Sequence, residues 1–142
     1  MSTEKTKPAC GVIYVASGKK FIKEAEISLA SLRKSNPGVP VMLLTDAPIA
    51  HPEKWDKVEV DESLGALTTT GTSCKAKLYM DRAPWDRCLY IDTDTLVVGD
   101  LAPGFALLDR FEFAAEQMAG GHHYTVPGVP PSYPEISGGV LF

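Results

Sequence analysis

Two aspartates separated by one residue follow the most apolar strand-like stretch of the chain. Asp92 and Asp94 come directly after residues 88–91, and the apolar residues 96–98 follow at once. In extended backbone, alternate side chains point to the same side, so the two carboxylates are expected to lie close together. Such a like-charge pair at the edge of a core requires water, a basic partner or a divalent cation to offset it. Oxygen ligands on so short a stretch suit Mn²⁺ or Mg²⁺, so the pattern predicts a metal site, with a plain strand end and turn cap as the alternative.

The segments around this pair predict an α/β fold with a mainly parallel sheet flanked by helices. A β-branched and aromatic run at residues 12–16 predicts a buried strand, and apolar residues at helical spacing predict a helix over 21–35 that ends at Asn36-Pro37-Gly38. Residues 39–44 form a second apolar strand, which completes a strand–helix–strand unit typical of α/β proteins. Further strands are expected at 57–61, 88–91, 111–116 and from 137 onward, with a short helix at 72–80.

Composition narrows the class of protein. The 142 residues are expected to form a single domain, 1–142, and a net charge of −4 without an extended basic run disfavours nucleic acid as a partner. No apolar run is long enough for a membrane span and the N-terminus lacks the apolar stretch of a signal peptide, so a cytoplasmic location is expected. Three cysteines without a Cys-x-x-Cys pair predict free thiols.

Three separated blocks resemble, in the same order, the glycogenin-like and bacterial galactosyltransferase-like glycosyltransferases of family 8. They are residues 13–17 with the helix that follows, residues 77–101 with the Asp92-Thr93-Asp94 motif, and residues 136–142. The resemblance implies the GT-A fold, a Rossmann-like nucleotide-diphospho-sugar transferase domain, of which this chain would be the N-terminal part, truncated at its C-terminus. It also implies a metal-dependent transfer of sugar from a nucleotide-diphosphate sugar, such as a UDP-sugar, to an acceptor that these residues do not identify.

The resemblance also implies a donor-binding role for matching positions, while no residue is identified as catalytic nucleophile or base. The metal would neutralise the diphosphate leaving group, and the family's further metal-ligating histidine has no counterpart in these residues. Ser137-Gly138 stands where the family has Asn-Ser, and the two glycines at 138 and 139 allow close approach of the backbone to the sugar. The implied set comprises Val15, Ser17, Gly18 and Phe21 at the base and ribose, Lys77 at the phosphates or sugar, Asp92 and Asp94 at the metal, Asp92 and Thr93 at the ribose, and Ser137 and Gly138 at the sugar.

Other interpretations stay open. The chain could be a non-catalytic nucleotide-sugar-binding fragment, or a phosphotransferase of the haloacid-dehalogenase type, because residues 92–96 are close to Asp-x-Asp-Gly-Thr-Leu but lack its glycine. The His122-His123 pair is interpreted as a solvated loop rather than as metal ligands, and Trp55 and Trp85 as packing residues. An uncovered sheet would expose apolar surface, which predicts self-association.

Overall fold

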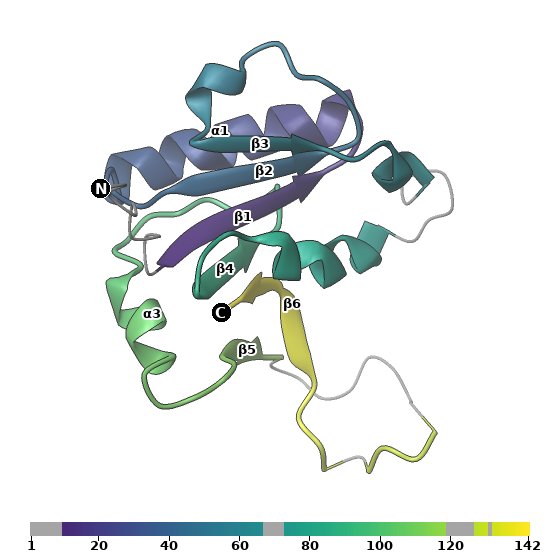
Figure 1. The fold of residues 1–142 in the computed structure, drawn as a ribbon. Helices are drawn as coiled ribbons and strands as arrows, with labels where there is room; N and C mark the ends of the chain where they lie inside the picture. Colours follow the sequence, from purple (N-terminus) through teal and green to yellow (C-terminus); the bar gives the residue numbers. More distant parts are fainter. Residues whose placement is uncertain (1–9, 67–72, 119–126, 131) are drawn as a thin grey trace, which may run out of the picture.

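The computed structural model describes residues 10–66, 73–118, 127–130 and 132–142, without the side chains of Ser73 and Cys74. Its centre is a six-stranded sheet in the order β3-β2-β1-β4-β6-β5 (Figure 1). The pairs β1–β2, β1–β4 and β2–β3 are parallel, whereas β6 is antiparallel to β4 and β5. This confirms an α/β fold with a mostly parallel sheet. The strands are β1 (Cys10–Ala16), β2 (Val41–Thr45), β3 (Lys57–Val60), β4 (Arg87–Ile91), β5 (Ala115–Gln117) and β6 (Ile136–Leu141).

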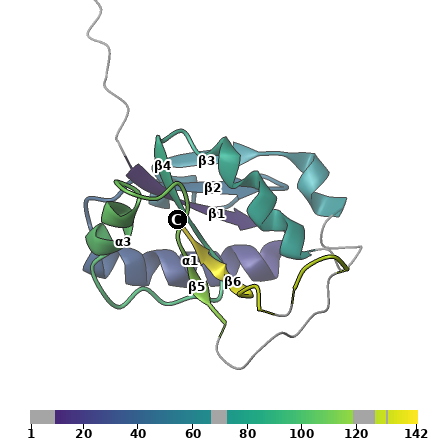
Figure 2. The ribbon, with the colours of Figure 1, turned by 90° about the horizontal axis from the view of Figure 1, so that it is seen from below.

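Helices cover both faces of the sheet. The α-helix α1 (Lys19–Ser35) packs on one face and the 3₁₀ helix η3 (Ser73–Arg82) on the other (Figure 2). Alternate residues of β1 enter the two cores, because side chains alternate across a strand. Tyr14 packs with Leu29 on the α1 side, whereas Ile13 packs on the η3 side. The strand β2 is buried over its whole length, as a central strand covered on both faces must be.

Several expected elements differ in the structure. The expected helix at 72–80 is the 3₁₀ helix η3, and the expected strand at 111–116 is reduced to β5. A short helix α3 (Ala102–Leu107), not anticipated, follows residues 96–98, which form no strand despite their apolar character. Two short 3₁₀ helices, η1 (Pro52–Lys54) and η2 (Glu62–Leu64), flank β3.

Side chains of α1 and of its C-terminal cap hold the backbone of residues 97–101. The Ser31 hydroxyl accepts a hydrogen bond from Val97 N at 2.9 Å. Asn36 donates to Gly99 O at 2.8 Å and accepts from Leu101 N at 2.9 Å. Because these backbone groups are bonded to helix side chains, they need no neighbouring strand. The chain after β4 therefore leaves the sheet and runs along α1.

Other sequence expectations have different outcomes. Cys10 and Cys88 are free thiols, and Trp55 packs edge-on against Tyr14 at 5.6 Å between ring centroids. No helix within the described residues is long and apolar enough to cross a membrane. His122-His123 lies outside the described residues. Self-association stays a prediction; exposed apolar side chains include Leu78, Val98, Phe111 and Tyr133.

Candidate functional site

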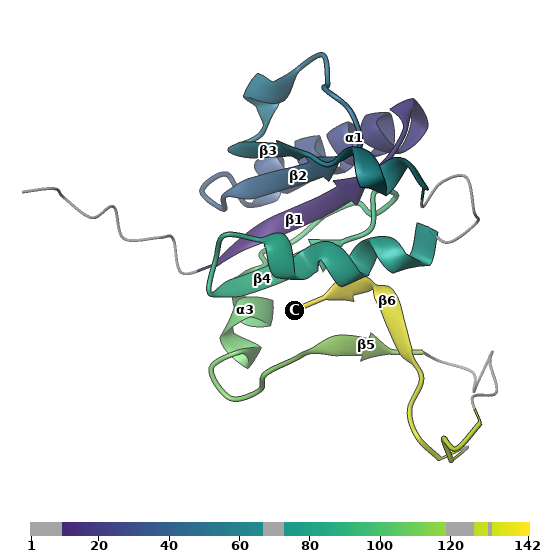
Figure 3. The same ribbon diagram turned by 45° about the vertical axis from the view of Figure 1, so that its right-hand side comes forward.

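The carboxyl ends of the parallel strands β1, β2 and β4 lie along one edge of the sheet, where open α/β sheets bind their ligands. Because β6 is antiparallel to β4, β6 begins at this edge, and Asp92 N donates a hydrogen bond to Gly139 O at 2.8 Å. The helix η3 passes over β1 and β4 beside the start of β6 (Figure 3). Lys77, Asp92, Gly138 and Gly139 meet here. We call these four residues, together with Asp94 two positions after Asp92, the carboxyl-edge site.

Both carboxylate oxygens of Asp92 face a polar group. The Tyr90 hydroxyl donates to Oδ1 at 2.6 Å, because residues two apart in an extended segment share a side. The ammonium of Lys77 lies 4.0 Å from Oδ2. Burial raises the pKa of Tyr90, and its bond to Asp92 and the charges of Asp92 and Asp94 raise it further, so the phenol stays a neutral donor. Asp92 is therefore held in one orientation from two sides.

Glycine at position 138 makes room for Lys77. Lys77 Nζ donates to Gly138 O at 2.9 Å and lies 5.8 Å from the centre of the Tyr90 ring. A Cβ at position 138 would stand 2.4 Å from that nitrogen, and one at position 139 would stand 3.3 Å from Asp92 Oδ2. The two glycines thus allow β6 to approach both charged side chains closely.

Asp94 completes the predicted acidic pair. Its side chain is exposed and forms no hydrogen bond or ion pair within the described part of the chain. Across those residues, no three His, Cys, Asp or Glu side chains form a group that could hold a metal ion. The donor set is two carboxylates, which suits a hard cation whose remaining positions are filled by water and phosphate oxygens. The chemistry of these two carboxylates is therefore of the kind that Mn²⁺ or Mg²⁺ prefers.

Asp46, directly after β2, braces the turn between β1 and α1. Its carboxylate accepts hydrogen bonds from Ser17 Oγ at 2.7 Å and from Gly18 N at 3.0 Å. Gly18 has a φ of 86°, which a side chain would strain. Burial by itself would raise the pKa of Asp46, but the bonds from Ser17 and Gly18 outweigh it and hold the pKa below its usual value. Asp46 is therefore ionised at neutral pH and fixes the predicted base-binding turn.

The remaining predicted residues lie around this edge in different settings. Val15 is only 6% exposed and packs in the η3-side core, so a donor contact there would come from its backbone. Phe21 packs against the α1-side core, with Lys20 Nζ 5.5 Å from its ring centre. Thr93 donates to Glu24 of α1 at 3.2 Å, and Ser137 Oγ accepts from Gly139 N at 3.4 Å.

Sequence reasoning missed three residues of this region, Asp46, Tyr90 and Glu24. A signal existed for two of them. Asp46 follows a buried strand next to β1, and Tyr90 precedes Asp92 by the two residues that place side chains on one side. Glu24 could not be found in this way, because only the packing of α1 brings it to Thr93.

The architecture is similar to that of solved glycosyltransferases. The structure of the glycosyltransferase GlyE of Streptococcus pneumoniae TIGR4 matches with a TM-score of 0.60 and 20% identity, over 92% of this chain and 33% of that one. Its apo form matches with a TM-score of 0.57 and 19% identity, over 94% and 33%. The chain thus spans about a third of the length of these structures. No protein-family model and no curated protein sequence matches it. The described residues therefore have a glycosyltransferase-like Rossmann fold.

Proposed function

We propose that this chain is the donor-binding part of a metal-dependent glycosyltransferase of the GT-A, glycogenin-like type. It would take a sugar from a nucleotide-diphosphate sugar, in the first instance a UDP-sugar. The observation that carries the proposal is the meeting of Lys77, Asp92 and Gly138 at the edge where the parallel strands end, with Asp94 beside them in sequence. The glycosyltransferase-like fold supports it.

The chemistry of this reaction requires positive charge at the diphosphate, because the bond from sugar to phosphate breaks with negative charge on the leaving group. Mn²⁺ or Mg²⁺ held by Asp92 and Asp94 would supply that charge as a Lewis acid. Lys77 adds a cation from the protein, kept 2.9 Å from Gly138 O and 4.0 Å from Asp92 Oδ2. Bound to a neutral carbonyl, this ammonium keeps donors free for a phosphate oxygen.

The two ends of the donor would meet different parts of the same edge. The turn at Ser17 and Gly18, braced by Asp46, would hold the base and ribose with Val15, Phe21 and Thr93. The start of β6, with Ser137 and Gly138, would lie beside the sugar. Preorganised backbone and side chains at both ends would orient the sugar–phosphate bond, which is a large part of catalysis in group transfer.

Calorimetric titration with UDP, with and without Mn²⁺, tests this proposal. We expect binding that requires Mn²⁺ and is lost in Asp94→Asn, because the charge of Asp94 would hold the metal. Asp86→Asn is the matched control, since Asp86 is also an exposed aspartate but lies before β4, at its other end. Absence of metal-dependent binding of any nucleoside diphosphate, or equal binding by Asp94→Asn, would contradict the proposal.

A non-catalytic donor-binding module is the second candidate, because Lys77, Asp92 and Asp94 of the carboxyl-edge site would bind a donor and none of them is assigned as a nucleophile or base. Incubation with a panel of UDP-sugars separates the two. Release of UDP or transfer to an added acceptor supports the transferase, whereas binding without turnover supports the module. The phosphotransferase alternative gains no support, because the acidic pair follows β4 rather than the first strand.

A further inference from the structure

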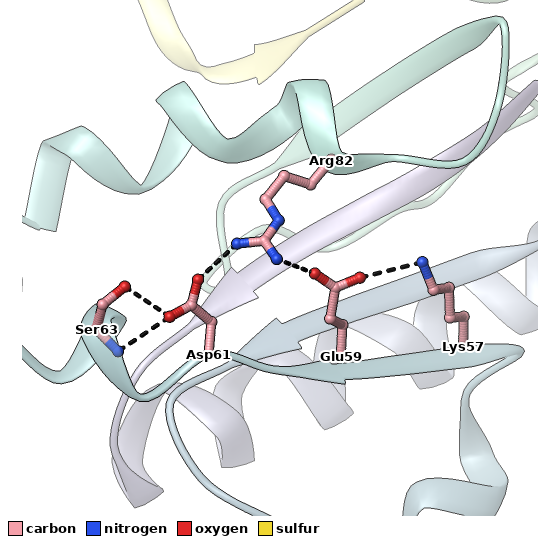
Figure 4. Close-up of polar contacts among 5 residues, drawn as sticks. All are labelled: Lys57, Glu59, Asp61, Ser63 and Arg82. Carbon is pink, nitrogen blue, oxygen red and sulfur yellow. Dashed lines mark hydrogen bonds and ion pairs between the residues drawn. The ribbon is translucent and has the colours of Figure 1, made fainter.

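Arg82, the last residue of η3, joins this helix to the edge strand of the sheet. Its guanidinium contacts the carboxylate of Glu59 on β3 and lies 2.5 Å from that of Asp61 (Figure 4). Each carboxylate has a second partner: Lys57 bonds Glu59 at 3.1 Å, and the Ser63 hydroxyl and amide bond Asp61 at 2.6 and 3.0 Å. Arg82 is therefore held by two carboxylates that are themselves fixed.

The helix η3 depends on such tertiary contacts. Its ten residues form a 3₁₀ helix, although runs longer than about three or four residues are uncommon because their hydrogen-bond geometry is poor. On its buried side, Ala76, Tyr79 and Met80 pack against the core, and such apolar contacts are not directional. Among the described residues, directional contacts of η3 include those of Arg82, which bonds the β3 end of the sheet, and of Lys77, which bonds Gly138 of β6. η3 is thus tethered between the two sides of the sheet.

We propose that Arg82 is a positioning residue that sets where η3 places Lys77 at the carboxyl-edge site. This inference rests on the proposed function, since Lys77 matters only if that site binds a donor. Lys77 precedes Arg82 by five residues, about 10 Å along a 3₁₀ helix, and misplacement by about 1 Å is enough to harm a positioned group. A single exposed ion pair contributes little to stability. The function of this forked contact is therefore geometric: the planar guanidinium holds its two terminal nitrogens at a fixed angle to the two carboxylates, whereas a lysine ammonium is a point charge on a flexible stem.

The test measures UDP affinity in the presence of Mn²⁺ for Arg82→Gln and Arg82→Lys, each with native Lys77 and with Lys77→Met. We expect both Arg82 variants to weaken binding by about 3- to 10-fold when Lys77 is present and to have no further effect in Lys77→Met, because sites that act through one group are not additive. Arg82→Lys keeps the positive charge but not the paired nitrogens of the guanidinium. A loss of UDP affinity in this variant therefore shows that positioning, and not charge alone, is required.

Arg87→Gln is the matched control. It breaks an ion pair with Asp109 at 2.6 Å, and its side chain is 40% exposed against 37% for Arg82. We expect no change in UDP affinity. Unchanged affinity in both Arg82 variants, or an equal loss in the Lys77→Met background, overturns the inference.

Hydrogen exchange of the η3 amides separates failure of this inference from failure of the proposed function. Faster exchange in Arg82→Gln and Arg82→Lys, but not in Arg87→Gln, supports the tether even if the native chain binds no nucleotide. Faster exchange together with no nucleotide binding would contradict the proposed donor site but would still support the anchoring of η3 by Arg82. Exchange that is the same in all variants overturns the tether, whatever the nucleotide result.

Discussion

Replacing Gly138 by alanine tests the close approach of β6 to Lys77. The new Cβ would stand 2.4 Å from Lys77 Nζ, 3.1 Å from Cδ and 3.2 Å from Cε. Gly138 is not one of the described glycines with positive φ, which are Gly18 and Gly128, so alanine is compatible with the backbone there. The strain must therefore be relieved by Lys77, whose flexible end moves away and loses its 2.9 Å hydrogen bond to Gly138 O.

The magnitude follows from the interaction that Lys77 would make with the donor. A hydrogen bond to a charged group contributes about 1.5–3 kcal/mol. If the displaced ammonium no longer reaches the phosphates, UDP binding weakens by about 10- to 100-fold, at 1.4 kcal/mol per factor of ten. The side chain is 25% exposed, so solvent screening favours the lower end of that range. Stability should change little, because only the tip of a flexible side chain has to move.

Calorimetry of UDP binding with Mn²⁺ is the assay, beside thermal unfolding. Lys77→Met gives the loss expected when the ammonium is removed, and Gly138→Ala should approach it. The control is Gly38→Ala, because nothing lies within 4 Å of a Cβ at that position. Native affinity in Gly138→Ala together with reduced affinity in Lys77→Met would refute the steric reasoning. Native affinity in both would remove Lys77 from the site.

Three further predictions concern stability, each measured by urea unfolding. Asn36→Ala should destabilise the protein by about 2–4 kcal/mol, since it removes two hydrogen bonds to the chain after β4; a loss below about 0.5 kcal/mol would contradict the role of this side chain. Asp46→Asn should be less stable than the native chain at neutral pH, and this difference in stability should narrow as the pH falls below 3.8. The reason is that the hydrogen bonds that lower the pKa of Asp46 stabilise the folded protein only while the carboxyl group is ionised. A difference in stability that does not change with pH would contradict this role of Asp46. Ser28→Ala should cost about 1–3 kcal/mol by leaving the buried Tyr14 hydroxyl, now bonded at 2.8 Å, without a partner, and adding Tyr14→Phe should recover most of that; no recovery would exclude this explanation.

Local pattern was enough to predict β1, β2 and β4 and to place Asp92 and Asp94 directly after β4. The strands β1, β2 and β4 are apolar runs bounded by turn residues, and periodicity identifies such runs without tertiary information. The βαβ unit follows from their order, and the position of Asp92 and Asp94 at the carboxyl edge follows from the direction of β4. The same local reasoning failed for residues 111–116, of which only the end belongs to β5, because apolar character alone does not show where a strand finds a pairing partner.

The sequence by itself determined which residue types reach the carboxyl edge, since strand direction and alternation depend on local patterns. Only the tertiary structure decided which of them touch. Lys77 meets Gly138, 61 residues later, and Arg82 meets Glu59, 23 residues earlier. Asp46 accepts a hydrogen bond from the hydroxyl of Ser17, which lies at the end of the neighbouring strand β1. Such contacts depend on how the helices pack on the sheet. Residue spacing along the chain does not specify this packing, because it is determined by all the contacts of the core together.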